Sequence, residues 1–204
     1  MWETLRRGLP TSNWCWRDFK KRLQQTPLGN NAIIGFGDGS CQHTNVNTTR
    51  LWSFEKLRIK KNTSRGEHVN SLGFYALNGK SVYHDTETVK KKDIARFLRV
   101  IRHENPLGTI ILIWDNARAH LSKLVRGTAY LLNIILVFLP PYSPDLNPIE
   151  FIWKSIKKEL SIKCLMTKEE VRDSVEEMFK KFSLSLSFAK SWIQKILKPL
   201  NISL

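Results

Sequence analysis

The chain has 204 residues, 42% of them hydrophobic and seven of them Trp, which suits one domain with a sizeable core and argues against disorder. Lys and Arg total 33 against 18 Asp and Glu, a formal net charge of +15 that is spread along the chain. A folded domain this basic is typical of proteins that meet a polyanion, so we predict a nucleic-acid partner. Charge alone leaves open a solubilising surface, or a ribosomal or chromatin-type binder.

The first half of the chain predicts three antiparallel strands. The apolar run Ala32–Phe36 predicts a strand that ends at Asp38. The runs His68–Leu77 and Lys80–His84 flank Asn78-Gly79, which is the strongest short signal for a hairpin. We therefore expect these two runs to pair with each other and with the first strand.

Helices and strands alternate in the second half. Asp93–Ile101 has apolar residues at helical spacing, and Ala117–Leu132 is a second predicted helix. Thr109–Trp114 and Ile134–Leu139 are apolar runs of buried-strand type, the first of which ends at Asp115. Strand–helix–strand units of this kind imply parallel pairing with right-handed crossovers.

Further helices follow the last predicted strand. Asn147 suits the N-cap of a helix and Pro148 its first position, and the apolar face of this helix comprises Ile149, Ile152, Trp153, Ile156 and Leu160. Thr167 and Glu170 have the spacing of a capping box, and residues 185–198 form the last predicted helix. The whole order predicts an α/β, ribonuclease-H-like fold, with a mixed five-stranded sheet flanked by helices.

Three carboxylates fall where this order brings chain segments together. Asp38 and Asp115 follow strands that we expect to be adjacent, and Glu150 lies in the first turn of the helix after the fifth strand. Ligand sites of open α/β sheets lie beyond the carboxyl ends of the strands. Clustered carboxylates repel unless a cation neutralises them, and oxygen-only ligands suit Mg²⁺ or Mn²⁺. We predict that the three hold two such ions, which activate a water or a 3′-hydroxyl against a phosphodiester.

Each carboxylate also has an ordinary structural interpretation. Asp38 lies between two glycines and suits a turn, and Asp115 suits the N-cap of the next helix. Glu150 stands three residues after Asn147, a capping-box position, and could pair with Lys154. The combination of two aspartates at strand ends and a helical glutamate favours a site.

Two stretches resemble blocks of a known transposase family. Trp114–His120 reads W-D-N-A-R-A-H and looks like the Asp-Asn-x-x-x-His block of mariner-like transposases. Pro140–Glu150 reads P-P-Y-S-P-D-L-N-P-I-E and closely resembles the Tyr-Ser-Pro-x-Leu-Asn-Pro-Ile-Glu block of that superfamily, best matched by its bacterial and archaeal insertion-sequence-630 branch. Asp115 and Glu150 differ by 150 − 115 = 35 positions, the spacing typical of the superfamily. The resemblance covers roughly residues 32–165.

This resemblance implies the catalytic domain of a DNA transposase. Asp38, Asp115 and Glu150 would be the catalytic metal ligands of a DDE endonuclease that cleaves double-stranded DNA at element ends. It also implies cut-and-paste strand transfer into TA target sites by a homodimer or larger synaptic complex. A non-catalytic DNA-binding remnant or accessory fragment of a transposase is the alternative, and an RNA/DNA-hybrid nuclease is a third, disfavoured by the block that ends at Glu150.

Two departures from the family pattern affect these expectations. The family usually carries Asp-Glu after its first strand, whereas Gly39 follows Asp38 here. Asp18 and Asp85 are still poorer candidates, because neither ends an apolar strand ahead of the rest of the sheet. The family also carries an N-terminal helix-turn-helix region, for which Leu5–Leu23 leaves room for only a remnant. We therefore expect little preference for element ends unless an upstream-encoded helix-turn-helix segment is supplied.

Four other side chains are candidate DNA contacts. Lys154, Lys157 and Lys158 lie on the polar face of the helix that carries Glu150, where they would hold phosphates or remain solvated. His120 follows Asp115 by five residues. It would orient the site, touch DNA or be a satisfied structural histidine.

The domain boundaries and the compartment follow from the same patterns. We expect a DNA-binding remnant and linker over residues 1–31, the catalytic domain over 32–165, and a helical extension packed on it over 166–204. Trp14–Leu23 predicts a short basic helix within the remnant. Three widely spaced cysteines suggest neither a disulfide framework nor a zinc site. The most apolar stretch, Tyr130–Pro141, is shorter than the ~20 residues that span a bilayer, so we expect no membrane partner and a cytoplasmic, nucleoid-associated prokaryotic protein.

Overall fold

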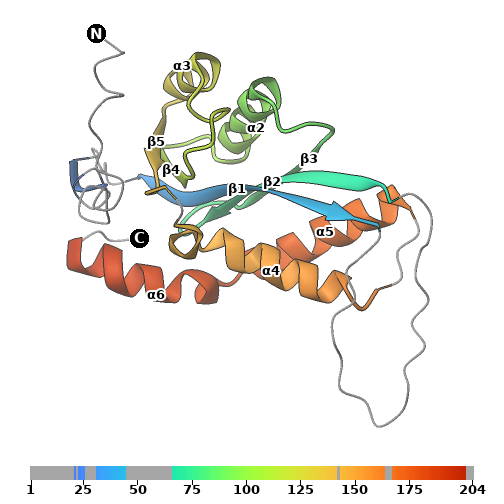
Figure 1. The fold of residues 1–204 in the computed structure, drawn as a ribbon. Coiled ribbons are helices and arrows are strands. Elements are labelled where there is room, and N and C mark those ends of the chain that lie inside the picture. Colours follow the sequence, from blue (N-terminus) through green and yellow to red (C-terminus); the bar gives the residue numbers. More distant parts are fainter. Residues whose placement is uncertain are drawn as a thin grey trace.

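A five-stranded mixed sheet crosses the middle of the molecule (Figure 1). The computed structural model describes residues 21, 23–25, 31–44, 66–141, 143–163 and 167–200. Lys21 and Leu23 are helical, and the rest of the predicted basic helix Trp14–Leu23 lies outside the described residues. The strands, in the spatial order β3-β2-β1-β4-β5, are β1 (Ile33–His43), β2 (His68–Ala76), β3 (Val82–Thr86), β4 (Ile110–Trp114) and β5 (Ile134–Phe138).

Pairing and helix placement confirm the predicted ribonuclease-H-like fold. β1, β2 and β3 pair in antiparallel fashion, whereas β1–β4 and β4–β5 are parallel. The helices α2 (Lys91–Glu104) and α3 (Lys123–Leu131) lie on one face of the sheet, and α4 (Ile149–Leu160) and α5 (Lys168–Ser183) on the other (Figure 1). None of the helices in the described ranges has both the length and the apolar character needed to cross a bilayer.

The last described residues, from Leu186 to Leu200, form a continuous helical run beneath the sheet (Figure 1). The predicted last helix at 185–198 is confirmed, although it mixes helix types, and its pieces are η2 (Leu186–Ala189), α6 (Lys190–Trp192), the π-helical η3 (Ile193–Leu197) and η4 (Lys198–Leu200). The predicted capping box of α5 is also confirmed, since Thr167 Oγ1 accepts from Glu170 N at 3.2 Å and Thr167 N donates to Glu170 Oε2 at 3.3 Å.

The sheet divides the hydrophobic core in two, because its central strands are covered on both faces. All five residues of β4, I-I-L-I-W, are buried, as expected for a parallel strand with helices above and below it. On the face of α4 and α5, Phe36 of β1 meets Trp192 edge to face, with ring centroids 4.7 Å apart. The segments after residue 166 therefore share a core with the sheet, and the predicted domain boundary at 165 remains a prediction.

β1 is longer than predicted, and this corrects the position of Asp38. The sequence places Asp38 at the end of a strand, but β1 continues to His43 because it keeps pairing with β2, from Asp38↔Gly73 to His43↔His68. Pairing with β4 stops earlier, at Phe36↔Ile113. Asp38 is therefore inside β1 and still lies at the edge of the sheet where β4 has ended.

The connection between β2 and β3 also differs from the expected tight turn at Asn78-Gly79. The last β2–β3 pair is Phe74↔Val82, so a longer loop joins the strands. The Asn78 side chain instead bonds to the start of β1 and to the residue before it: its Oδ1 accepts from Ile34 N at 2.9 Å and its Nδ2 donates to Ala32 O at 2.8 Å. These bonds join residues more than 40 positions apart, which a local turn signal does not report.

Candidate active site

The parallel pairing of β1 with β4 brings the two aspartates together. β4 ends at Trp114, one residue before Asp115, and its neighbour β1 carries Asp38 two residues beyond the last β1–β4 pair. The predicted helix Ala117–Leu132 is shorter than expected, because α3 begins only at Lys123. Asp115 therefore caps no helix; its Oδ1 accepts from Ala117 N at 3.1 Å within a turn.

Glu150 reaches the same edge from the opposite face of the sheet, on the first turn of α4. The predicted N-cap role of Asn147 is wrong: Asn147 is buried, and its Nδ2 donates to Gly37 O of β1 at 3.1 Å. This bond ties the start of α4 to the residue before Asp38. No capping box forms at Glu150, so its carboxylate is left available to the site.

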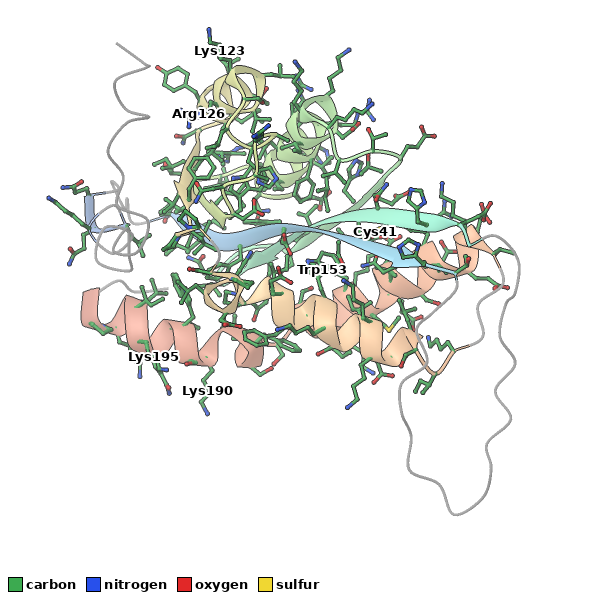
Figure 2. The ribbon with its side chains drawn as sticks, viewed as in Figure 1. Cys41, Lys123, Arg126, Trp153, Lys190 and Lys195 are labelled. Carbon is green, nitrogen blue, oxygen red and sulfur yellow. The ribbon has the colours of Figure 1, made fainter. Side chains whose placement is uncertain are left out.

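A glycine on β2 sets how closely α4 can approach. Gly73 pairs with Asp38, and a Cβ at Gly73 would lie 2.7 Å from Trp153 Cζ2 and from Phe179 Cε2. Such approaches are far inside van der Waals contact, so only glycine lets Trp153 of α4 lie against the sheet here (Figure 2). Gly73 thus helps to hold Glu150 at the level of Asp38.

The three carboxylates line one cavity of about 410 Å³. Prolines and Leu139 form part of its wall, and polar groups from the same loops also face it, namely Asn116, Ser143 and Asn147. Asp38, Asp115 and Glu150 come from β1, the loop after β4, and α4, so the tertiary fold alone gathers them. Tyr142, which belongs to the block that resembles the transposase family, lies outside the described residues.

The electrostatics of Asp38 reflect this crowding. Burial, followed by the neighbouring carboxylate of Glu150, raises the pKa of Asp38 well above its ordinary value, and Asp115 adds to the rise. The backbone N–H of Gly39 opposes the rise by bonding the charged form. A carboxylate held in this way gains most from a nearby cation, since a cation offsets both burial and repulsion.

Asp115 is held differently, by His120. The Nδ1 atom of His120 lies 2.6 Å from Asp115 Oδ1, and this hydrogen bond is the main reason that the pKa of Asp115 is lowered. The His120 ring stacks on Trp114, with centroids 3.9 Å apart and planes at 15°. Only 7% of the His120 side chain is exposed, so the ring is placed to orient Asp115 and offers little surface to a phosphate.

The donor chemistry of the cavity fits a hard divalent cation. In the part of the chain that the structure describes, no three His, Cys, Asp or Glu side chains form a ready-made metal-ligand group. The three carboxylates nevertheless face one cavity, and the Oδ1 atom of Asn147, another lining residue, is buried without a hydrogen-bond partner among the described residues. Oxygen donors of this kind suit Mg²⁺ or Mn²⁺.

The departure at Gly39 leaves the position of Asp38 intact. Gly39 is exposed, and a Cβ there would meet Leu72 Cδ2 at 3.4 Å, an ordinary contact. The backbone at Gly39 therefore has room for the Cβ of a larger residue. The lysines Lys154, Lys157 and Lys158 are exposed along α4, beyond Glu150, and their DNA contacts stay a prediction.

Sequence reasoning missed the roles of Gly73 and Asn147 in placing Glu150. Gly73 interrupts the apolar end of β2, between Leu72 and Phe74, and an isolated strand glycine signals close approach of another segment. Asn147 carried the opposite signal, because an Asn before Pro favours a helix cap. Only its burial beside β1 reveals the bond to Gly37.

Comparisons with solved structures agree with the fold. The Mos1 mariner paired end complex with Mn has 20% sequence identity and a TM-score of 0.64, covering 91% of this chain and 58% of that one. The catalytic domain of Mos1 mariner transposase has 15% identity and a TM-score of 0.56, covering 92% and 91%. At these identities the likeness shows a shared fold.

The sequence comparisons show the family as well as the fold. An uncharacterized protein, y4pE/y4sA, of Sinorhizobium fredii (strain NBRC 101917 / NGR234) is 32% identical over 75 residues, which cover 37% of this chain and half of that protein. The chain thus spans only half of this relative's length. A family model described as DDE superfamily endonuclease matches residues 34–172, well over half of the chain. The chain therefore belongs to the DDE superfamily of endonucleases.

Proposed function

We propose that this chain is the catalytic domain of a DNA transposase that cleaves and joins phosphodiesters with Asp38, Asp115 and Glu150. The observation that carries the proposal is the convergence of these three carboxylates, from three separate elements, on one cavity at the edge of the sheet. Membership of the DDE endonuclease superfamily supports the reaction class.

The chain's own residues hold and orient the reacting groups. Asp38, Asp115 and Glu150 would bind two Mg²⁺ or Mn²⁺ ions, which supply charge neutralisation, an activated attacking oxygen and a stabilised leaving oxygen. His120 holds Asp115 in its charged form through the 2.6 Å bond. Because the pKa of Asp38 is raised, cation binding would displace any proton that Asp38 holds.

The proposed substrate is double-stranded DNA. The net charge of +15 favours a polyanion, and the Mos1 structure of similar fold is a paired end complex with Mn. The two blocks that resemble mariner-like transposases support cleavage at element ends, strand transfer into TA sites and a homodimer or larger synaptic complex. An insertion sequence of the 630 branch would be the source of the element, with a helix-turn-helix segment that recognises its ends.

A cleavage assay on DNA that carries the element's own ends tests this proposal. We expect nicking that requires Mg²⁺ or Mn²⁺, and its loss in Asp115→Asn and in Glu150→Gln, because each substitution removes a charged ligand and keeps the shape of the side chain. Thermal unfolding of both variants should remain cooperative. Metal-dependent nicking by either folded variant would refute the assignment, and DNA binding without cleavage by the wild type would favour the non-catalytic alternative.

A further inference from the structure

A row of cations lies on the exposed face of α2. Lys92, Arg96 and Arg99 are exposed and follow one another at i, i+4 and i+7, so they lie on one side of the helix. The opposite side is buried in the core through residues that include Ile94, Phe97 and Leu98. We call these three cations the α2 row.

No acidic side chain of the described segments forms an ion pair with the α2 row. Among these residues, no carboxylate lies within ion-pair distance of Lys92, Arg96 or Arg99. Of the two acids of α2, Asp93 accepts from Thr88 and from the backbone at the helix start and attracts Arg96 only at longer range than an ion pair, and Glu104 pairs with Lys80. The three charged groups of the row are thus accessible to a ligand in solution.

A face kept only for solubility would carry both signs of charge, since like charges one helical turn apart destabilise a helix. α5 has such a face: its acidic residues alternate with Lys and Arg, and Glu176 pairs with Lys180 at 2.6 Å. The α2 row has no such ion pair within the described part of the chain, and the attraction of Asp93 for Arg96 leaves three cations set one helical turn apart. An external polyanion would relieve the repulsion.

The row begins beside the candidate active site. Val89, two residues before α2, would be 3.8 Å from a Cβ on Gly39, the neighbour of Asp38, so the start of α2 adjoins the cavity's edge of the sheet. α3 starts just after the loop of Asp115 and packs beside α2, and its first residue, Lys123, points outward from the same layer (Figure 2). A basic surface therefore leads away from the cavity over α2 and α3.

We propose that the α2 row binds the phosphate backbone of a DNA duplex that leaves the cavity over this face of the sheet. Seven residues of helix rise roughly 10 Å, which is about the length of duplex axis over which one strand advances by three phosphates, at 3.4 Å of axis each. This contact is separate from the α4 lysines, which lie on the other face. The choice of duplex DNA over other polyanions rests on the proposed function.

A matched pair of triple variants tests the α2 row in the 204-residue chain. The first carries Lys92→Gln, Arg96→Gln and Arg99→Gln, and the control carries Lys181→Gln, Lys190→Gln and Lys195→Gln. The control lysines are exposed on the opposite layer, where Lys190 and Lys195 point away from the sheet (Figure 2). Each triple removes the same charge and keeps a good helix former, so net charge alone cannot separate them.

Binding to a fluorescent DNA duplex is measured in EDTA over a range of salt, which keeps cleavage out of the assay. We expect the slope of log K against log salt to become shallower by about 2 to 3 in the row variant, at ~0.9 per lost phosphate contact, and by less than about 1 in the control. Equal changes in the two variants, or an unchanged slope in the row variant, would overturn the proposal. Single-stranded RNA of the same length is assayed alongside the duplex. If the row variant loses affinity for this RNA and keeps its affinity for duplex DNA, the proposal is also overturned.

The two proposals can fail separately. If the wild type binds duplex DNA through the α2 row but never nicks it with Mg²⁺ or Mn²⁺, the proposed function fails and the α2 row stands. If nicking depends on Asp115 and Glu150 while the row variant binds duplex DNA like the wild type, the α2 row fails and the proposed function stands.

Discussion

The two aspartates of the candidate site are held in opposite electrostatic states. Asp38 is crowded by burial and by Glu150, so its pKa is raised well above the ordinary aspartate value of 3.8. Asp115 accepts a hydrogen bond from His120, so its pKa is lowered. The pair therefore combines one carboxylate whose charged form the fold favours with one whose charged form the fold disfavours. Separated pKa values of neighbouring acids are typical of functional sites.

Replacement of Asp38 by an asparagine should make the metal-free protein more stable at neutral pH. Because the pKa of Asp38 is raised by folding, its contribution to stability is fully present below pH 3.8 and is lost as the pH rises through the raised folded value. The amide side chain has no charge to bury, so the variant escapes this loss. Urea unfolding in EDTA should give a higher free energy of unfolding for Asp38→Asn at pH 7. The gap between variant and wild type should close towards about pH 4, and a less stable variant at neutral pH would contradict the electrostatic picture.

His120 should act as a positioning residue for Asp115. His120→Ala removes the 2.6 Å bond and should raise the Mg²⁺ concentration needed for half-maximal cleavage by about 10- to 100-fold, the usual effect of losing a partner of a metal ligand. His120→Asn can still donate to Asp115 and should recover part of the loss. A purely structural role, through stacking on Trp114, predicts lower thermal stability in both variants with an unchanged Mg²⁺ requirement.

At the scale of elements, the seating of α4 decides whether Glu150 can join the aspartates. The apolar face of α4 packs on the sheet with Ile149, Ile152 and Trp153 buried. Gly73 leaves the room for this close approach, and Asn147 fixes the start of the helix on β1. The position of the Glu150 carboxylate therefore depends on the absence of a side chain at Gly73 of β2.

Gly73→Ala tests this seating, with Gly39→Ala as its matched control on the paired strand. The new methyl of Gly73→Ala would overlap Trp153, Phe179 and Ile149 at 2.7 to 3.0 Å, so we expect a loss of about 1 to 3 kcal/mol in the free energy of unfolding and a loss of cleavage. Gly39→Ala meets only ordinary contacts and should change stability by no more than about 0.5 kcal/mol. Urea unfolding and the cleavage assay measure both effects. Equal stability of the two variants would mean that α4 is not seated through Gly73.

At the scale of the whole molecule, one cavity is lined by carboxylates from separate parts of the fold. Its carboxylates come from the antiparallel part of the sheet, from the parallel part and from the helical layer beneath. A ligand of the cavity therefore binds only the assembled fold and should stabilise it as a unit.

Divalent cations should accordingly raise the melting temperature. A metal ion at about 100 times its dissociation constant contributes about 2.7 kcal/mol, which corresponds to roughly 5 to 10 °C for a chain of this size. Ca²⁺ can serve as a non-reactive probe beside Mg²⁺ and Mn²⁺. The shift should shrink strongly in Asp115→Asn and in Glu150→Gln. The same shift in wild type and both variants would place metal binding outside the three carboxylates.

The sequence by itself determined the order of strands and helices, the capping box at Thr167 and the candidacy of Asp38, Asp115 and Glu150. These features depend on hydrophobic periodicity and on chemistry within a few residues, which a single sequence displays.

Only the tertiary structure decided where these residues stand. β1 runs on through Asp38 because β2 continues to pair with it. Asn78 and Asn147 bond to β1 instead of forming the turn and the cap that their neighbours favour. The His120 ring stacks on Trp114 and bonds to the carboxylate of Asp115. The physical reason is common to all of these: a polar group bonds to the partner that the packed fold places beside it, and in the case of Asn147 that partner is 110 residues away along the chain.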